Sequence, residues 1–190
     1  MPVDPNAIAT WANAVTVGRI LVSPLMFILI PDGDKGSWVA FGLWFVLCCS
    51  DGIDGYLARR HGTTRSGAFL DPLADKVLVL GAMFTLVSRD VYWVLPVVLI
   101  AVREVGISMY RTLVGARGVS VPASRLAKFK TFFQQLSVGF AIAPLTTNDA
   151  TWLWLWLLWI SVALAVISGG QYLSRAMRSG PADADPASAI

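Results

Sequence analysis

Six apolar runs divide the chain, and short polar segments separate them. The runs cover residues 15–30, 38–57, 77–87, 92–114, 132–145 and 152–173. A helix that crosses a bilayer needs about 20 mainly apolar residues. The third and fifth runs reach this length only if they continue through the polar neighbours at 69–76 and 128–131. The pattern therefore predicts an all-α, polytopic bundle of six transmembrane helices, in which the polar extensions face the interior because lipid would not tolerate them.

Composition supports a membrane protein. Of the 190 residues, 56% are hydrophobic and 14% are charged, and the mean hydropathy is +0.64. These values are typical of integral membrane proteins rather than soluble domains. Four tryptophans gather near the start of the last apolar run, where an interfacial aromatic belt would lie. We interpret them as lipid-facing residues: Trp152, Trp154, Trp156 and Trp159.

The chain divides into three regions, and its charge predicts their orientation. Residues 1–12 form an N-terminal segment that could lie at the interface, residues 13–174 form the membrane domain, and the Pro- and Ala-rich residues 175–190 form a disordered tail. Positive charge gathers at 59–65, at 111–130 and in the tail, whereas the other turns carry few cations. The positive-inside rule then places both termini and these basic segments on the cytoplasmic side of the cytoplasmic membrane.

Four aspartates in or beside the apolar runs suggest a metal site. Asp51 and Asp54 are three residues apart, and Asp71 and Asp75 are four apart, so each pair shares one face of a helix. A charge near the bilayer centre costs at least ~2.5–3.5 kcal/mol on insertion scales, so four carboxylates need positive compensation. Two such faces turned toward each other would form a polar cavity near the cytoplasmic side, rich in the oxygen ligands that hard divalent cations prefer.

The residues from 51 to 75 also carry a recognisable motif. They contain the pattern D-x2-D-G-x2-A-R, a spacer, and then G-x3-D-x3-D. This pattern resembles the signature of the CDP-alcohol phosphotransferases, membrane enzymes with six helices that use divalent metal to displace CMP from a CDP-linked lipid or alcohol. The matching positions are Asp51, Asp54, Gly55, Ala58, Arg59, Gly67, Asp71 and Asp75.

The resemblance implies roles for individual residues. Asp51, Asp54 and Asp71 would be ligands of Mg²⁺ or Mn²⁺, with two ions expected, and Asp75 would be both a ligand and the catalytic base. The CDP-lipid would be bound by residues of the motif and of the first apolar run: Asn13, Thr16, Gly55, Ala58, Arg59, Thr64 and Gly67.

Three sequences that flank the motif point to a subfamily. They resemble segments of phosphatidylglycerophosphate synthases. The first is N-A-V-T-V-G-R-I, which begins at Asn13; the other two are R-E-V-G-I-S-M-Y-R, which ends at Arg111, and S-R-L-A-K-F-K-T-F-F-Q, which ends at Gln134. That subfamily joins CDP-diacylglycerol to sn-glycerol 3-phosphate. Five cations would suit the phosphate of such an acceptor: Arg19, Arg103, Arg111, Lys128 and Lys130. For Arg103 and its neighbour Glu104, a structural ion pair between helices is an equally good interpretation.

We therefore expect a phospholipid-synthesising transferase whose partners are CDP-diacylglycerol, glycerol 3-phosphate and membrane lipids, with no nucleic acid. Dimers are common in the family, which allows a homodimer. Within the family, inositol phosphate, serine or phosphatidylglycerol remain alternative acceptors. A cation transporter is the rival from another class, but an ion pathway should continue across the bilayer, and no acid recurs at matching depth in the last two apolar runs.

Overall fold

The computed structural model describes the backbone of residues 11–33, 35–61, 65–115, 125–147 and 150–178. The side chains of residues 11, 12, 51, 53–71, 113–128, 147, 173 and 175–178 fall outside this description. Within the described ranges the chain is all-helical and contains no strand, which confirms the all-α part of the predicted fold class. The helices are α1 (Trp11–Leu29), α2 (Trp38–His61), α3 (Arg65–Ser88), α4 (Val94–Gly115), α5 (Arg125–Ile142), α6 (Pro144–Thr147) and α7 (Thr151–Arg178).

The six long helices coincide with the six apolar runs, and α6 is a short addition. As expected for the third and fifth runs, α3 and α5 begin in polar sequence, at Arg65 and Arg125. The apolar runs therefore predicted where the helices lie. Helices α3 and α5, however, begin several residues before the apolar runs at 77–87 and 132–145.

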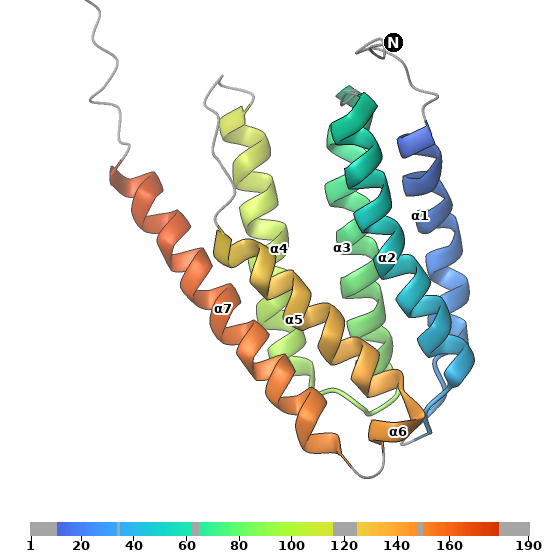
Figure 1. Cartoon of the computed structure of the whole chain (residues 1–190). Helices are drawn as coiled ribbons and strands as arrows, with labels where there is room; N and C mark the ends of the chain where they lie inside the picture. The colour runs from blue at the N-terminus through green and yellow to red at the C-terminus, as the bar shows by residue number, and fades with distance from the viewer. Residues whose placement is uncertain (1–10, 34, 62–64, 116–124, 148–149, 179–190) are drawn as a thin grey trace, which may run out of the picture.

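The long helices run alternately up and down (Figure 1). One end of the bundle holds the starts of α1, α3 and α5 and the ends of α2, α4 and α7 (Figure 1). We call it the acid-bearing end, because the segments with the four aspartates approach it. Helix α1 packs against α2 and α3, and α7 packs against α4 and α5. Contacts of α3 with α4 and α5, and of α2 with α5, join the two groups.

The interior changes character along the bundle. The half away from the acid-bearing end is filled by apolar side chains, among them Met26, Leu86 and Ile142. Toward the acid-bearing end, buried positions become polar and charged. They include Asn13, Thr16, Arg19, Lys130 and Gln134.

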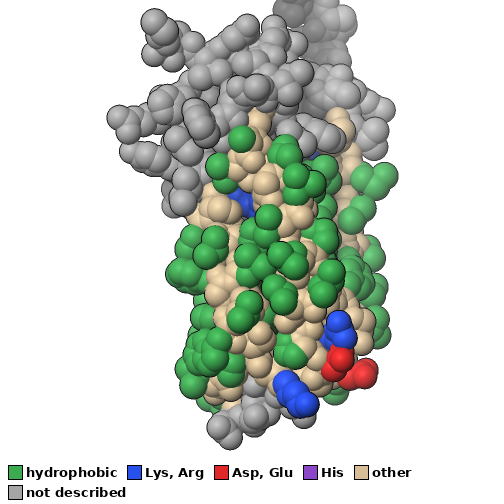
Figure 2. Space-filling model, turned by 90° about the vertical axis from the view of Figure 1, so that its right-hand side faces the viewer, with side chains coloured by type: hydrophobic (Ala, Val, Ile, Leu, Met, Phe, Trp, Pro, Cys, Tyr) green, Lys and Arg blue, Asp and Glu red, His purple; other side chains and the backbone are tan. Residues whose placement is uncertain are grey.

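The outside of the bundle is apolar. Leu21 and Ile28 are each 73% exposed and Trp93 is 72% exposed. On the face shown in Figure 2, hydrophobic side chains cover the described body, and most of the visible charges gather near one end. Buried cations and a broad apolar exterior are the reverse of a soluble protein's pattern, so they are consistent with a helical membrane protein.

Length and composition give one clear membrane span in the described part of the chain, Thr151–Tyr172 in α7. Shorter apolar stretches occur at Asn13–Leu29 and Trp38–Ser50. The structure thus supports a membrane helix at α7, while the six-span topology remains a prediction.

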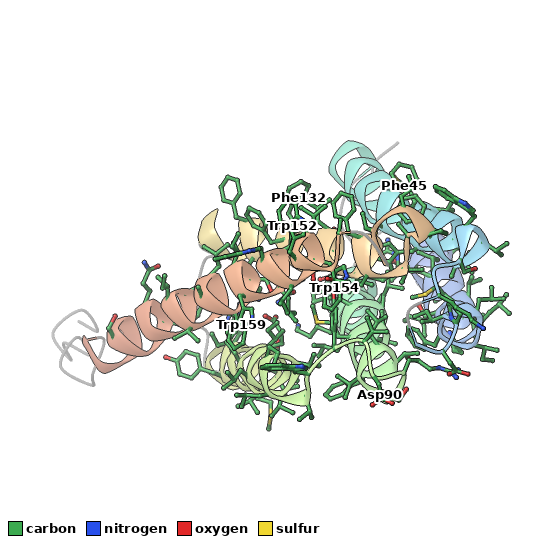
Figure 3. All side chains as sticks on the ribbon, turned by 90° about the horizontal axis from the view of Figure 1, so that it is seen from below. Phe45, Asp90, Phe132, Trp152, Trp154 and Trp159 are labelled. Carbon is green, nitrogen blue, oxygen red and sulfur yellow. The ribbon has the colours of Figure 1, made fainter. Side chains whose placement is uncertain are left out.

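One tryptophan differs from the expected arrangement. Trp152, Trp156 and Trp159 are exposed on α7, as expected for lipid-facing residues, but Trp154 is buried. Its ring lies 5.4 Å from that of Tyr92, centroid to centroid. Figure 3 shows Trp154 on the inner side of α7 and Trp152 on the outer side. The lipid-facing interpretation is therefore wrong for Trp154, because this position of α7 faces the turn before α4.

Candidate functional site

The backbone brings the two aspartate pairs to similar depths in α2 and α3. Asp54 lies seven residues before the end of α2 at His61 (61 − 54), and Asp71 lies six residues after the start of α3 at Arg65 (71 − 65). Because the two helices run in opposite directions (Figure 1), both pairs lie near the acid-bearing end. The spacing of three and four residues within continuous helices places each pair on one helical face, as expected.

Asp75 is the one member of this set whose side chain the structure describes. It is half-buried, and it is close enough to Lys130 of α5 for their charges to interact. The remaining residues of the predicted metal and CDP-lipid sites within the motif have side chains outside the described part: Asp51, Asp54, Gly55, Ala58, Arg59, Thr64, Gly67 and Asp71. No group of three His, Cys, Asp or Glu side chains gathers among the residues that are described.

A buried network of charges adjoins Asp75. Oε1 of Glu104 accepts hydrogen bonds from Nη1 of Arg103, at 3.1 Å, and from Nζ of Lys130. Nη2 of Arg103 also donates to Oγ of Ser168, at 2.9 Å. The Lys130, Arg103 and Glu104 side chains are only 4%, 11% and 12% exposed. Through these contacts the network ties α4 to α5 and α7.

Glu104 balances part of the positive charge that the network buries. Burying an unpaired ion costs several kcal/mol, and a counter-ion with good hydrogen bonds offsets that cost. Glu104 supplies one negative charge between two cations, and Asp75 supplies a second one next to Lys130, so the four groups are formally neutral together. The two buried cations can still donate hydrogen bonds to an anionic group near the acid-bearing end. The structural interpretation of Glu104 and the substrate-binding interpretation of the two cations are thus compatible.

A polar face of α1 approaches the aspartates from another side. Asn13, Thr16 and Arg19 are all buried, and their spacing of three residues puts them on one face of the helix. Nε of Arg19 donates a hydrogen bond to Oγ of Ser50, at 3.2 Å, and Ser50 is the residue directly before Asp51 in α2. The structure therefore brings these three predicted residues to the region of the motif, with Arg19 linked to the helix that carries Asp51.

Arg111 lies apart from the buried cations. It is exposed and lines a groove of about 440 Å³ between α3 and α4, together with Pro72 and Lys76. Nζ of Lys76 points back to the Pro72 carbonyl, at 3.3 Å. The side chain of Lys128 lies outside the described part. The five cations predicted for the acceptor phosphate thus do not form one cluster in the described structure.

Two residues of this region were not among the predicted site residues. Ser168 binds Arg103, and Gln134 is buried one helical turn after Lys130 on α5. Both are polar residues inside apolar runs, at 152–173 and 132–145, and such residues in a membrane helix usually face the bundle interior. That signal could have identified both.

Similarity to known proteins agrees with this geometry. A family model described as CDP-alcohol phosphatidyltransferase matches residues 9–167, which include α1, both aspartate pairs and the buried charge network. The chain belongs to the CDP-alcohol phosphatidyltransferase family. The resemblance inferred from the motif is thereby confirmed.

Three curated members of the CDP-alcohol phosphatidyltransferase family illustrate the similarity. A probable phosphatidylglycerophosphate synthase of Mycobacterium tuberculosis is 35% identical over 90% of this chain and 83% of its own length. A CDP-diacylglycerol–glycerol-3-phosphate 3-phosphatidyltransferase of Rickettsia prowazekii is 34% identical over 90% of this chain and 96% of its own. The protein of the same name in Bacillus subtilis is 31% identical over 86% of this chain and 93% of its own.

Proposed function

We propose that this protein transfers the phosphatidyl group of CDP-diacylglycerol to sn-glycerol 3-phosphate and releases CMP. The names of the relatives support this donor and this acceptor. The structural observation that carries the proposal is the pair of buried cations, Arg103 and Lys130, which share Glu104 beside Asp75. An acceptor that is itself a phosphate dianion needs such charge close to the reacting hydroxyl, whereas serine or glycerol does not.

In the proposed reaction, a hydroxyl oxygen of glycerol 3-phosphate attacks the phosphorus that carries diacylglycerol. The bond from that phosphorus to the oxygen shared with the cytidylate phosphate breaks, and CMP leaves with the bonding electron pair. Asp75 accepts the hydroxyl proton as general base, while Lys130 and Arg103 orient the acceptor phosphate. Asn13, Thr16 and Arg19 would contact the CDP-lipid or acceptor from the buried face of α1.

The proposal includes two divalent ions, Mg²⁺ or Mn²⁺, held by Asp51, Asp54, Asp71 and Asp75. The residues fit this role in two ways: the four backbone positions lie at similar depths on two helices, and the one carboxylate that is described, that of Asp75, is half-buried on α3. Hard cations prefer such oxygen ligands. Bound ions would neutralise charge on the attacking and leaving oxygens of the phosphoryl group.

We also propose that all six long helices cross the cytoplasmic membrane and that the acid-bearing end faces the cytoplasm. The apolar exterior supports insertion. The positions of the basic segments support the orientation, because the ends of α2 and α4 and the starts of α3 and α5 share that end (Figure 1). A homodimer in the membrane is part of the same proposal, by resemblance to the family.

The test is CMP release by the purified full-length protein in lipid nanodiscs. CDP-diacylglycerol and magnesium are supplied with glycerol 3-phosphate, glycerol, serine, inositol phosphate or phosphatidylglycerol in turn. We expect turnover with glycerol 3-phosphate and background rates with the others. Turnover with a different acceptor would overturn the acceptor assignment. Absence of CMP release with every acceptor, together with cation flux into sealed vesicles, would favour a transporter.

A further inference from the structure

The amide of Gln134 is a buried donor that no described residue of the protein satisfies. Gln134 is only 2% exposed, and its Nε2 atom is buried without a hydrogen-bond partner among the described residues. An unsatisfied buried donor costs about 1–3 kcal/mol, so native proteins contain few of them. Such a donor can take a ligand as its partner, because the described part of the chain supplies none.

Gln134 lies where an acceptor of the proposed reaction would reach it. It follows Lys130 by four residues on α5, so both side chains leave the same face of the helix, about 6 Å apart along its axis. Lys130 contacts Glu104 and interacts with Asp75. Arg103, which shares Glu104, also has a buried nitrogen, Nε, that finds no hydrogen-bond partner in the described part of the chain. Two unsatisfied donors thus accompany the same buried network.

We propose that Gln134 is a specificity-determining residue of the acceptor site, whose amide donates a hydrogen bond to an oxygen of the bound glycerol 3-phosphate. This inference rests on the proposed function and adds a neutral contact to its cations. A site that hydrogen-bonds a substrate oxygen discriminates strongly against analogues without it, because the buried donor is then left unpaired. Gln134 thereby helps to select a polyol phosphate.

The test compares the wild-type protein with Gln134→Met in nanodiscs, since methionine keeps the length and removes the amide. We measure KM for glycerol 3-phosphate, KM for CDP-diacylglycerol, kcat and Tm. We expect KM for glycerol 3-phosphate to rise about 10-fold or more, the usual worth of one hydrogen bond to a charged ligand. KM for CDP-diacylglycerol should stay unchanged, and Tm should not fall, because the substitution removes an unsatisfied donor.

A matched control is Trp154→Phe. Nε1 of Trp154 is likewise buried and unpaired among the side chains that the structure describes, but Trp154 packs against Tyr92, away from Asp75. This variant should leave KM for glycerol 3-phosphate unchanged. If Gln134→Met leaves that KM unchanged in an active enzyme, or raises both KM values equally, the inference fails. A lower Tm with unchanged kinetics would show that Gln134 is structural. Wild-type protein that does not use glycerol 3-phosphate would instead refute the proposed function.

Discussion

Replacing Glu104 with glutamine tests the buried charge network directly. The substitution keeps the size of the side chain and removes the only negative charge that contacts both Arg103 and Lys130 among the described residues. Both cations stay buried, with exposed fractions of 11% and 4%. Breaking a buried pair by removing one partner costs about 3–5 kcal/mol. Ser168 still accepts a hydrogen bond from Arg103, and Asp75 still interacts with Lys130. We therefore expect Glu104→Gln to lower the free energy of unfolding by about 3 kcal/mol, the lower end of this range.

Thermal unfolding in detergent provides the assay. For a chain of this size, ~1 kcal/mol shifts Tm by roughly 2–4 °C, so Glu104→Gln should lower Tm by roughly 6–12 °C. The double variant Glu104→Gln with Lys130→Met removes one stranded cation and should recover part of the loss. An exposed ion pair supplies the control: Asp32 pairs with Arg89 with its side chain 80% exposed, and Asp32→Asn should change stability by at most about 0.5 kcal/mol. A Tm for Glu104→Gln within 2 °C of wild type, on the scale of that control, would refute the reasoning.

Three further predictions concern catalysis. Asp71→Asn should abolish turnover at saturating magnesium or manganese while folding survives, because it removes a charged oxygen ligand without changing shape; near-normal CMP release would count against the metal site. Asp75→Asn should still bind CDP-diacylglycerol with metal but lose ~10²–10⁴-fold in single-turnover rate; lost binding with intact chemistry would leave Asp75 as a ligand only. Lys130→Met should raise KM for glycerol 3-phosphate more than Arg111→Ala does, because Lys130 is buried beside Asp75 and Arg111 is exposed on the α3–α4 groove. Equal KM values for these two variants would contradict that ranking.

The short helix α6 and the position of Trp154 show what hydropathy alone could not predict. Pro144 packs so closely on Gly36 that a Cβ atom added to Gly36 would lie 2.3 Å from the Cα atom of Pro144. The backbone N–H of Ser37 donates a hydrogen bond to the carbonyl of Ile142, at 3.0 Å. Both contacts join segments that are far apart in sequence. Nothing in the apolar run that ends at residue 145 predicts these contacts. In the same way, the run that contains Trp154 does not show which side of α7 faces the bundle.

The sequence by itself determined the all-helical fold, the six long helices, the family and the pairing of the aspartates on helical faces. These properties depend on local spacing: an apolar run of sufficient length, or acids three and four residues apart, specifies them without any partner. Only the tertiary structure decided that Lys130 and Arg103 share Glu104, that Arg103 reaches Ser168, and that Gln134 is buried. Lys130 lies 26 residues from Glu104, and Ser168 lies 65 from Arg103. Such contacts depend on the rotation and depth of each helix in the bundle, which are set by the packing of all the helices together.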